Sequence, residues 1–411
     1  MSLFRSERAA AVALVIAAGL GLALANSPIG EALVEASHAH VGIPGTVWDL
    51  SLAHWASDGL LAIFFLVAAI ELRHELTRGE LRSPARAVRP AIAAAGGVLA
   101  PIALYLAVTA GSGQEHGWPI PTATDIAFAL GVLAIVGRGL PSGLRAFMLA
   151  LAILDDIVAI VIIAVFFTAN VQILPLVLAV LGTAAFALLG GVVQRRLRRD
   201  GAPLARARAA DVALVALMVV IGVAVWSATL ASGIHATIAG VALGLVLAPG
   251  PAHATRHALE PVVNGAVLPI FAFAASLVII PAVPISSLQP AFWAIVIALP
   301  LGKLVGIAGA AWLGDRLLTR DRRARMSFAD LLAAGSLGGI GFTVSLLMVG
   351  LAFAGDPVLV AEGTLAVLLG SAVSILLSIG TVGRQAVYYR RLRRLRAAAV
   401  AHRGDAEAQR S

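Results

Sequence analysis

The sequence predicts an all-α protein that crosses a membrane many times, and three observations predict it: an apolar composition, recurring apolar runs and an asymmetric distribution of arginine. Of the 411 residues, 60% are hydrophobic and 13% are charged, and the mean hydropathy is +0.95. These values lie far outside the range of soluble globular domains. The chain has no cysteine, which excludes disulfides, thiolate chemistry and cysteine metal ligands.

Apolar runs long enough to span a bilayer recur along the chain. A spanning helix needs about 20 mainly apolar residues, and by that measure we count about twelve runs. They lie near residues 9–25, 59–79, 88–110, 121–137, 145–168, 171–193, 211–230, 233–248, 262–281, 290–314, 328–351 and 358–384.

Arginine is confined to alternate connections between these runs. The basic connections contain Arg5 and Arg8; Arg73, Arg78, Arg82, Arg86 and Arg89; Arg138 and Arg145; Arg195, Arg196, Arg198, Arg199, Arg206 and Arg208; Arg256; Arg316 to Arg325; and the tail from Arg384. By the positive-inside rule we expect a multi-pass protein of the bacterial inner membrane with both termini in the cytoplasm. Topology thus explains the net charge of +8, and no nucleic-acid partner is needed. A cleavable signal peptide ending near Ala25 is an alternative that leaves the remaining topology unchanged.

Two segments lie outside the apolar runs. We expect one transmembrane domain over residues 1–385, followed by a basic, disordered cytoplasmic tail over 386–411 that is attracted to anionic lipid. The connection 26–57 is the longest between spans and carries Trp48. It is either a partner-binding segment or a solvated loop with an aromatic side chain at the headgroup level.

Three carboxylates and one amine lie inside apolar runs. Asp155 and Asp156 are in the middle of one run, Asp125 follows Thr124 in another, and Lys303 lies in a third. Each such group costs roughly 2.5 to 3.5 kcal/mol on insertion, so a chain that keeps several uses them. Lys303 is the only lysine among 30 basic residues. A buried ammonium can lose its proton whereas arginine stays charged, so Lys303 is either a titrating group or a permanent ion pair that locks two helices.

The adjacent aspartates predict competition between a metal ion and protons. Consecutive helical residues project about 100° apart, so both side chains can border one cavity. Two close carboxylates do not both stay ionised without a cation. Sodium, a hard cation that prefers oxygen ligands, would favour the deprotonated pair of Asp155 and Asp156, with the Thr124 hydroxyl as a further ligand.

Two spans contain helix-breaking residues at membrane depth. The fourth holds Pro119 and Pro121 shortly before Asp125, and the eleventh holds the glycine run 335–341. Such breaks are tolerated where they line protein or water. Their placement predicts inverted-topology repeats whose interrupted helices meet at an ion site, with Asp125 facing positive helix ends and Lys303 negative ones. Close helix packing is the alternative explanation of the glycine run.

Five long motifs resemble one known family. They are Ala123-Thr-Asp-Ile-Ala-Phe-Ala-Leu-Gly-Val-Leu, Ala152-Ile-Leu-Asp-Asp, Ser232-Gly-Ile-His-Ala-Thr-Ile-Ala-Gly, Leu268-Pro-Ile-Phe-Ala-Phe-Ala and Gly338-Gly-Ile-Gly-Phe-Thr-Val-Ser. On these motifs the chain resembles NhaA-type sodium/proton antiporters over residues 5–385. The resemblance implies an electrogenic, pH-regulated exchanger that exports sodium or lithium against external protons. It also implies a homodimer bridged through residues 26–57, and no cofactor.

The resemblance also implies roles for particular residues. Asp156 corresponds to the main cation and proton carrier, Asp155 to its partner paired with Lys303, and Thr124 and Asp125 to members of the helix crossing. Glu71 and Glu75 correspond to the acidic pair of a cytoplasmic funnel. His235 corresponds to a histidine associated with the pH response. The stretch with Arg256, His257 and Glu260 departs from the family's acid and histidine arrangement for pH sensing, and only His257 aligns in kind.

Several alternatives remain open. His235 is equally explained as a hydrogen-bonded packing residue, and Glu71 and Glu75 as solvated helix ends opposite Arg73 and Arg78. The alternative function is a sodium-coupled transporter of another small solute with the same architecture. An intramembrane aspartyl protease is disfavoured because two of the aspartates are contiguous and Asp125 follows threonine.

Overall fold

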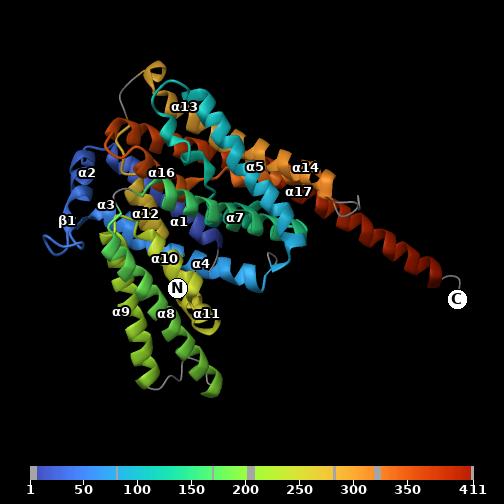
Figure 1. The fold of residues 1–411 in the computed structure, drawn as a ribbon. Coiled ribbons are helices and arrows are strands. Elements are labelled where there is room, and N and C mark those ends of the chain that lie inside the picture. Colours follow the sequence, from blue (N-terminus) through green and yellow to red (C-terminus); the bar gives the residue numbers. More distant parts are fainter. Residues whose placement is uncertain are drawn as a thin grey trace.

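A computed structural model describes residues 7–79, 82–168, 171–200, 209–280, 284–318 and 325–408. In these residues the protein is an all-α bundle with one short β-hairpin (Figure 1). Several of the basic residues used for the topology lie outside the described residues, among them Arg5, Arg206, Arg208, Arg320, Arg322 and Arg323. The predicted fold class, an all-α polytopic membrane protein, is confirmed.

The N-terminal part places the long predicted connection at one end of the bundle. Helix α1 (Glu7–Ala25) is followed, after a bend of 111°, by α2 (Gly30–His38). The hairpin of β1 (His40–Val41) and β2 (Leu50–Ser51) comes next, and then α3 (Leu52–His54), a π-helical turn (Trp55–Leu60) and α4 (Leu61–Thr77) as one long span. Trp48 of the hairpin packs on Trp55 and on Trp226, with ring centroids 6.3 and 6.0 Å away. The segment 26–57 is therefore folded and docked rather than a loose loop.

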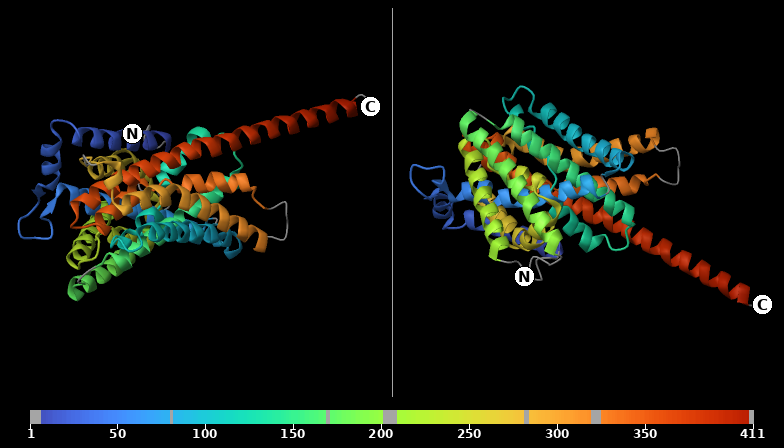
Figure 2. Two further views of the ribbon diagram at one scale, coloured as in Figure 1. Left: turned by 90° about the horizontal axis from the view of Figure 1, so that it is seen from above. Right: turned by 60° about the horizontal axis from the view of Figure 1, so that its bottom comes forward.

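The middle of the chain carries the first interrupted segment. Helix α5 (Pro84–Thr109) leads through a 3-10 turn (Ile120–Thr122) and an extended stretch to α6 (Ile126–Val136), followed by α7 (Ser142–Phe166). Helices α8 (Ile173–Asp200) and α9 (Ala209–Ala231) form a pair at the side of the bundle (Figures 1 and 2), and α10 (Thr237–Val246) returns to pack on α4.

The C-terminal half carries the second break. Helices α11 (Pro249–Val262) and α12 (Leu268–Ala275) are joined by a π-helical turn, as are α13 (Pro290–Ile297) and α14 (Lys303–Leu318). Helices α15 (Phe328–Gly338) and α16 (Phe342–Ala352) form one span bent by 49°. Helix α17 (Pro357–Ala408) is the longest and projects beyond the bundle (Figure 2).

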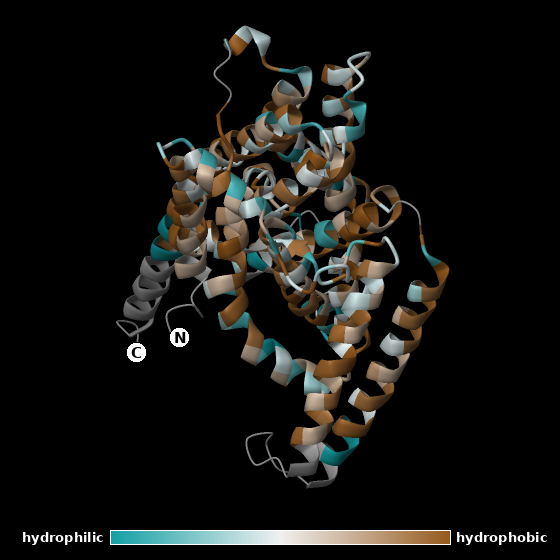
Figure 3. Cartoon of the chain, turned by 90° about the vertical axis from the view of Figure 1, so that its left-hand side faces the viewer, coloured by the Kyte–Doolittle hydropathy of each residue, from teal (hydrophilic) through white to brown (hydrophobic). Residues whose placement is uncertain are grey.

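The number of spans differs from the expected count of about twelve. Eight helices of the described residues are long and apolar enough to cross a membrane, or up to ten if each bent pair is one span. The difference has a physical reason: α6 and α10 have 11 and 10 residues, too few to cross a bilayer as unbroken helices. Apolar residues cover most of the helices in Figure 3, as lipid contact requires.

Close helix contact builds the core near the breaks. Gly96 of α5 and Gly306 of α14 face each other so closely that a Cβ added to either would collide with the backbone carbonyl of the other. Small residues allow this approach in a membrane, where van der Waals packing rather than water exclusion joins helices. The contact fixes α14, and with it Lys303 at its first position, against α5.

Helix α17 extends past residue 385, the expected end of the transmembrane domain. Helix α17 continues without interruption to Ala408. Alanine and arginine are strong helix formers, and extending an existing helix avoids the cost of nucleation.

Candidate functional site

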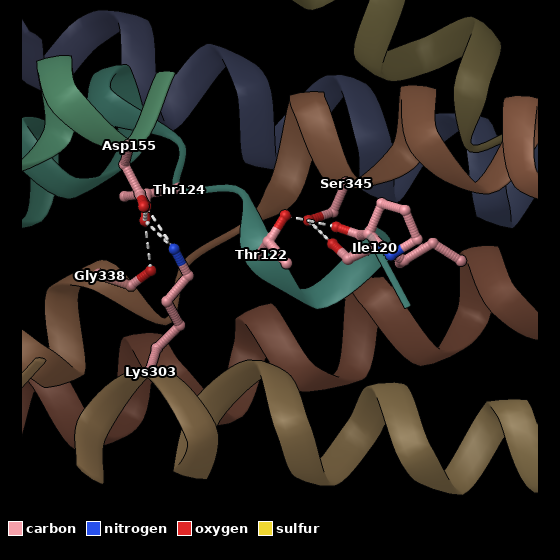
Figure 4. A network of polar contacts seen from close by, with 8 residues as sticks. Ile120, Thr122, Thr124, Asp155, Lys303, Gly338 and Ser345 are labelled. Atoms are coloured by element: carbon pink, nitrogen blue, oxygen red, sulfur yellow. Dashed lines mark hydrogen bonds and ion pairs between the residues drawn. The ribbon is translucent and has the colours of Figure 1, made fainter. Parts of the chain in front are cut away.

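Two interrupted segments cross in the middle of the bundle. The extended peptide before α6 meets the break between α15 and α16, where the Asp125 amide donates a hydrogen bond of 2.6 Å to the Ile340 carbonyl. The Thr124 hydroxyl donates to the Gly338 carbonyl at 2.7 Å (Figure 4). These bonds satisfy backbone groups that the breaks leave without a helical partner.

Asp125 caps two helices at this crossing. Its Oδ1 accepts from the Phe128 amide at the start of α6, at 3.0 Å. Its Oδ2 accepts from the amide and the hydroxyl of Thr343 at the start of α16, at 3.1 and 2.8 Å. A carboxylate is favourable there because both helix N-termini carry partial positive charge. The predicted position of Asp125 at positive helix ends agrees with this geometry.

Lys303 and Asp155 form a buried ion pair beside the crossing. The exposed fraction of the two side chains is 0% and 1%. The Lys303 ammonium donates to Asp155 Oδ2 and, at 3.1 Å, to the Thr124 hydroxyl, which also bonds Asp155 Oδ2 (Figure 4). No donor among the described residues reaches Asp155 Oδ1. Lys303 thus contacts a carboxylate and a hydroxyl, and the same Thr124 hydroxyl bonds the Gly338 carbonyl at the end of α15.

Asp156 has a different environment from its neighbour. Its exposed fraction is 6%, and it lines a cavity of 510 Å³ that also borders Glu71, Glu260 and Arg256. Within the described part of the chain, no side chain or amide donates a hydrogen bond to its carboxylate. One aspartate is therefore held by a lysine while the other borders an open space, as the turn of about 100° between consecutive helical residues allows.

The cavity lining includes charged side chains from α4 and α11. Arg256 lies between Glu71 and Glu260, with N–O distances of 3.5 and 3.8 Å. The predicted residues Glu75 and His257 do not line this cavity. The ring of His257 stacks on His253 with centroids 6.4 Å apart.

His235 lies apart from the ion pair and the cavity. One ring nitrogen, Nε2, is 3.1 Å from the Phe167 carbonyl, and the other, Nδ1, is 3.8 Å from Asp58 Oδ1. Trp226 donates to the Asp58 carbonyl at 2.9 Å, which places His235 beside the tryptophan cluster of the hairpin.

Sequence reasoning missed several members of the site. Thr343, the Gly338 carbonyl and the Ile340 carbonyl contribute to the crossing, and Arg145 lines the cavity. Ser345 donates to the Ile120 carbonyl at 2.7 Å (Figure 4). The signal for the two hydroxyls was present, since threonine and serine directly after a glycine break are suited to bonding a second broken backbone.

Fold and site together define a polytopic ion transporter, because interrupted helices cross at buried carboxylates and a cavity leads to one of them. The sequence of residues 1–382 matches the family model described as Na+/H+ antiporter 1. The chain belongs to this family.

Curated relatives match nearly the full length. The protein named Na(+)/H(+) antiporter NhaA 2 of Clavibacter michiganensis subsp. michiganensis is 53% identical over 97% of this chain and 94% of its own. The Na(+)/H(+) antiporter NhaA of Tropheryma whipplei (strain Twist) is 43% identical over 92% of this chain and 94% of its own. The Na(+)/H(+) antiporter NhaA of Streptomyces antibioticus is 42% identical over 90% and 76%. The predicted family is confirmed.

Proposed function

We propose that this protein is a secondary active antiporter that exports sodium or lithium in exchange for external protons, and is not an enzyme. The observation that supports this most directly is the pair of unequal aspartates: Asp155 bonded to Lys303, and Asp156 bordering the cavity. A carboxylate that borders water at membrane depth can hold a proton or a metal ion, and each excludes the other. Alternating occupancy by the two ions couples their movements.

We assign the exchange step to Asp156. Sodium entering the cavity displaces protons from the site, the Asp156 proton among them, and binds the Asp156 carboxylate, with Asp155 and backbone or hydroxyl oxygens as further ligands. More than one proton leaves for each sodium ion, as an electrogenic exchange requires. Lys303 neutralises Asp155 when no metal ion is bound, and Thr124 orients both groups.

The charged side chains that line the cavity adjust how readily cations enter it. Glu71 and Glu260 attract cations, and Arg256 between them limits that attraction. We assign His235 and His257 to the pH response, with His235 acting near Asp58 rather than at the ion site.

The charge asymmetry of the sequence and the family support a proposal for the membrane and the topology. We propose an electrogenic, pH-regulated protein of the inner membrane, with a transmembrane domain over 1–385, a cytoplasmic tail over 386–411 and both termini in the cytoplasm. The docked hairpin within residues 26–57 is the proposed bridge of a homodimer.

Everted membrane vesicles test this function. The vesicle interior is acidified by respiration, and a pH-sensitive dye reports proton release when NaCl or LiCl is added between pH 7 and 9, with choline chloride as the salt control. We expect dequenching with sodium or lithium and none with choline. A sodium-coupled transporter of another solute would leave the signal unchanged until that solute is supplied, and this result would refute the antiport proposal.

A further inference from the structure

The cytoplasmic stretch of α17 contacts the far ends of both helices that lead to the crossing. Helix α6 begins at the crossing with Asp125 as its cap, and α15 ends there at Gly338. Each has 11 residues, so their other ends lie about 16 Å away along the helix axes. Those far ends are Val136 of α6 and Phe328 of α15.

Asp330 joins the far end of α15 to α17. Ser327 caps α15, since its hydroxyl accepts from the Asp330 amide at 3.1 Å and donates to Asp330 Oδ2 at 2.7 Å. Two side chains of α17 bond the same carboxylate: Gln385 donates to Oδ1 at 2.7 Å and Tyr389 to Oδ2 at 2.7 Å.

Helix capping alone does not require this arrangement. A capping acid works well when exposed, whereas the exposed fraction of Asp330 is 4%. A buried carboxylate is costly unless donors satisfy it. Capping therefore does not explain why α17 supplies two hydrogen-bond donors to Asp330, and these donors point to a separate role for the contact.

A second contact joins α17 to the far end of α6. Arg393 donates to the carbonyls of Gly139 and Leu140 at 2.8 and 3.4 Å, in the turn that follows α6. Gly139 has φ of +106°, a conformation that turns this backbone sharply and that residues other than glycine rarely adopt. Gln385, Tyr389 and Arg393 are spaced four residues apart, so they share one face of α17.

We propose that Asp330, Gln385, Tyr389 and Arg393, here called the inner clamp, position the crossing for ion binding. Because α6 and α15 are short and rigid, fixing both far ends to one helix sets where Thr124 and the Gly338 carbonyl lie relative to Asp155 and Lys303. The inner clamp thus contains positioning residues that act on sodium affinity without touching the ion. The inference rests on the proposed antiport function.

The test removes single donors of the inner clamp and measures exchange kinetics. In everted vesicles, Tyr389→Phe should raise the apparent KM for sodium about three- to ten-fold, the range expected for coupling through a contact network. Tyr388→Phe is the matched control, since Tyr388 is 54% exposed and keeps its ring in this variant. Arg393→Gln should raise the KM in the same direction.

A graded series at Asp330 separates positioning from simple stabilisation. Asp330→Asn keeps one acceptor oxygen and Asp330→Leu keeps none, so the KM should rise in the order parent, Asn, Leu. If every variant keeps the parent KM within about two-fold and loses only the amount of folded protein, the inner clamp is merely structural and the inference is refuted. Absence of sodium-dependent dequenching in the parent would instead refute the antiport function, so the two failures are distinguishable.

Discussion

Asp125 and Thr343, which are 218 positions apart in the chain, are joined by two hydrogen bonds to one carboxylate oxygen. The other oxygen of Asp125 caps α6. One carboxylate thereby neutralises the starts of two helices that only the fold brings together. The bonds give hydrogen-bond partners to the Phe128 and Thr343 amides at the starts of α6 and α16.

Removing the Asp125 carboxylate should therefore weaken both helix starts. Asp125→Ala should lower the free energy of unfolding by about 1 to 4 kcal/mol, as two lost caps of about 0.5 to 2 kcal/mol each. Thr343→Val should cost less, because the Thr343 amide still bonds Asp125, and Thr343→Ser should be close to the parent. Thermal unfolding in detergent measures the order of stability of these three variants and the parent. Equal melting of Asp125→Ala and the parent would contradict the double-cap interpretation.

Because Lys303 is paired with Asp155, replacing Lys303 alone should destabilise the protein, and replacing Asp155 as well should restore part of that stability. Lys303→Ala leaves Asp155 buried without its cation and should destabilise the protein by roughly 3 to 5 kcal/mol. Replacing Asp155 by Asn in the same chain removes the uncompensated charge, so the double variant should melt above the single one. A double-mutant cycle on melting temperature in detergent checks this. Strictly additive effects would mean that the ion pair has no role in holding α7 to α14.

Asp156 should be needed for exchange but less needed for folding. Asp156→Asn keeps a side chain of the same shape and removes the charge that binds either ion. We expect dequenching to fall to background in vesicles that contain normal amounts of the variant protein, measured by immunoblot. Glu71→Gln, on the same cavity but farther from the crossing, is the matched control and should retain exchange with a raised KM for sodium. Sodium-dependent proton release by Asp156→Asn would overturn its assignment as the carrier.

Because sodium and protons compete for the same carboxylates, the direction in which the apparent KM for sodium changes with pH can be predicted. Protons occupy the site as the pH falls, so more sodium is needed to displace them, and the apparent KM for sodium should rise by up to about ten-fold per pH unit for each proton that competes with sodium. Purified protein titrated with sodium at several pH values, by calorimetry, measures the proton released for each sodium bound. A sodium affinity independent of pH would show that the two ions use different sites.

The sequence determined much of the architecture. The apolar runs and the absence of cysteine specify a helical membrane protein, and the isolated charges Asp155, Asp156, Asp125 and Lys303 specify where the chemistry lies. These features can be recognised from composition, because a charged side chain in an apolar run raises the free energy of membrane insertion whatever surrounds it. The five motifs specified the family in the same way.

The tertiary structure decided most of the charge contacts. The resemblance had already implied that Asp155 pairs with Lys303, but hydropathy could not tell that Arg256 lies between Glu71 and Glu260, or that His235 lies beside Asp58 away from the ion site. The count of spans also depended on the fold, because the proline and glycine residues predicted two breaks but not how short α6 and α10 are. Contacts across the bundle depend on how helices rotate and cross, and the sequence of a single helix contains no information on its neighbour.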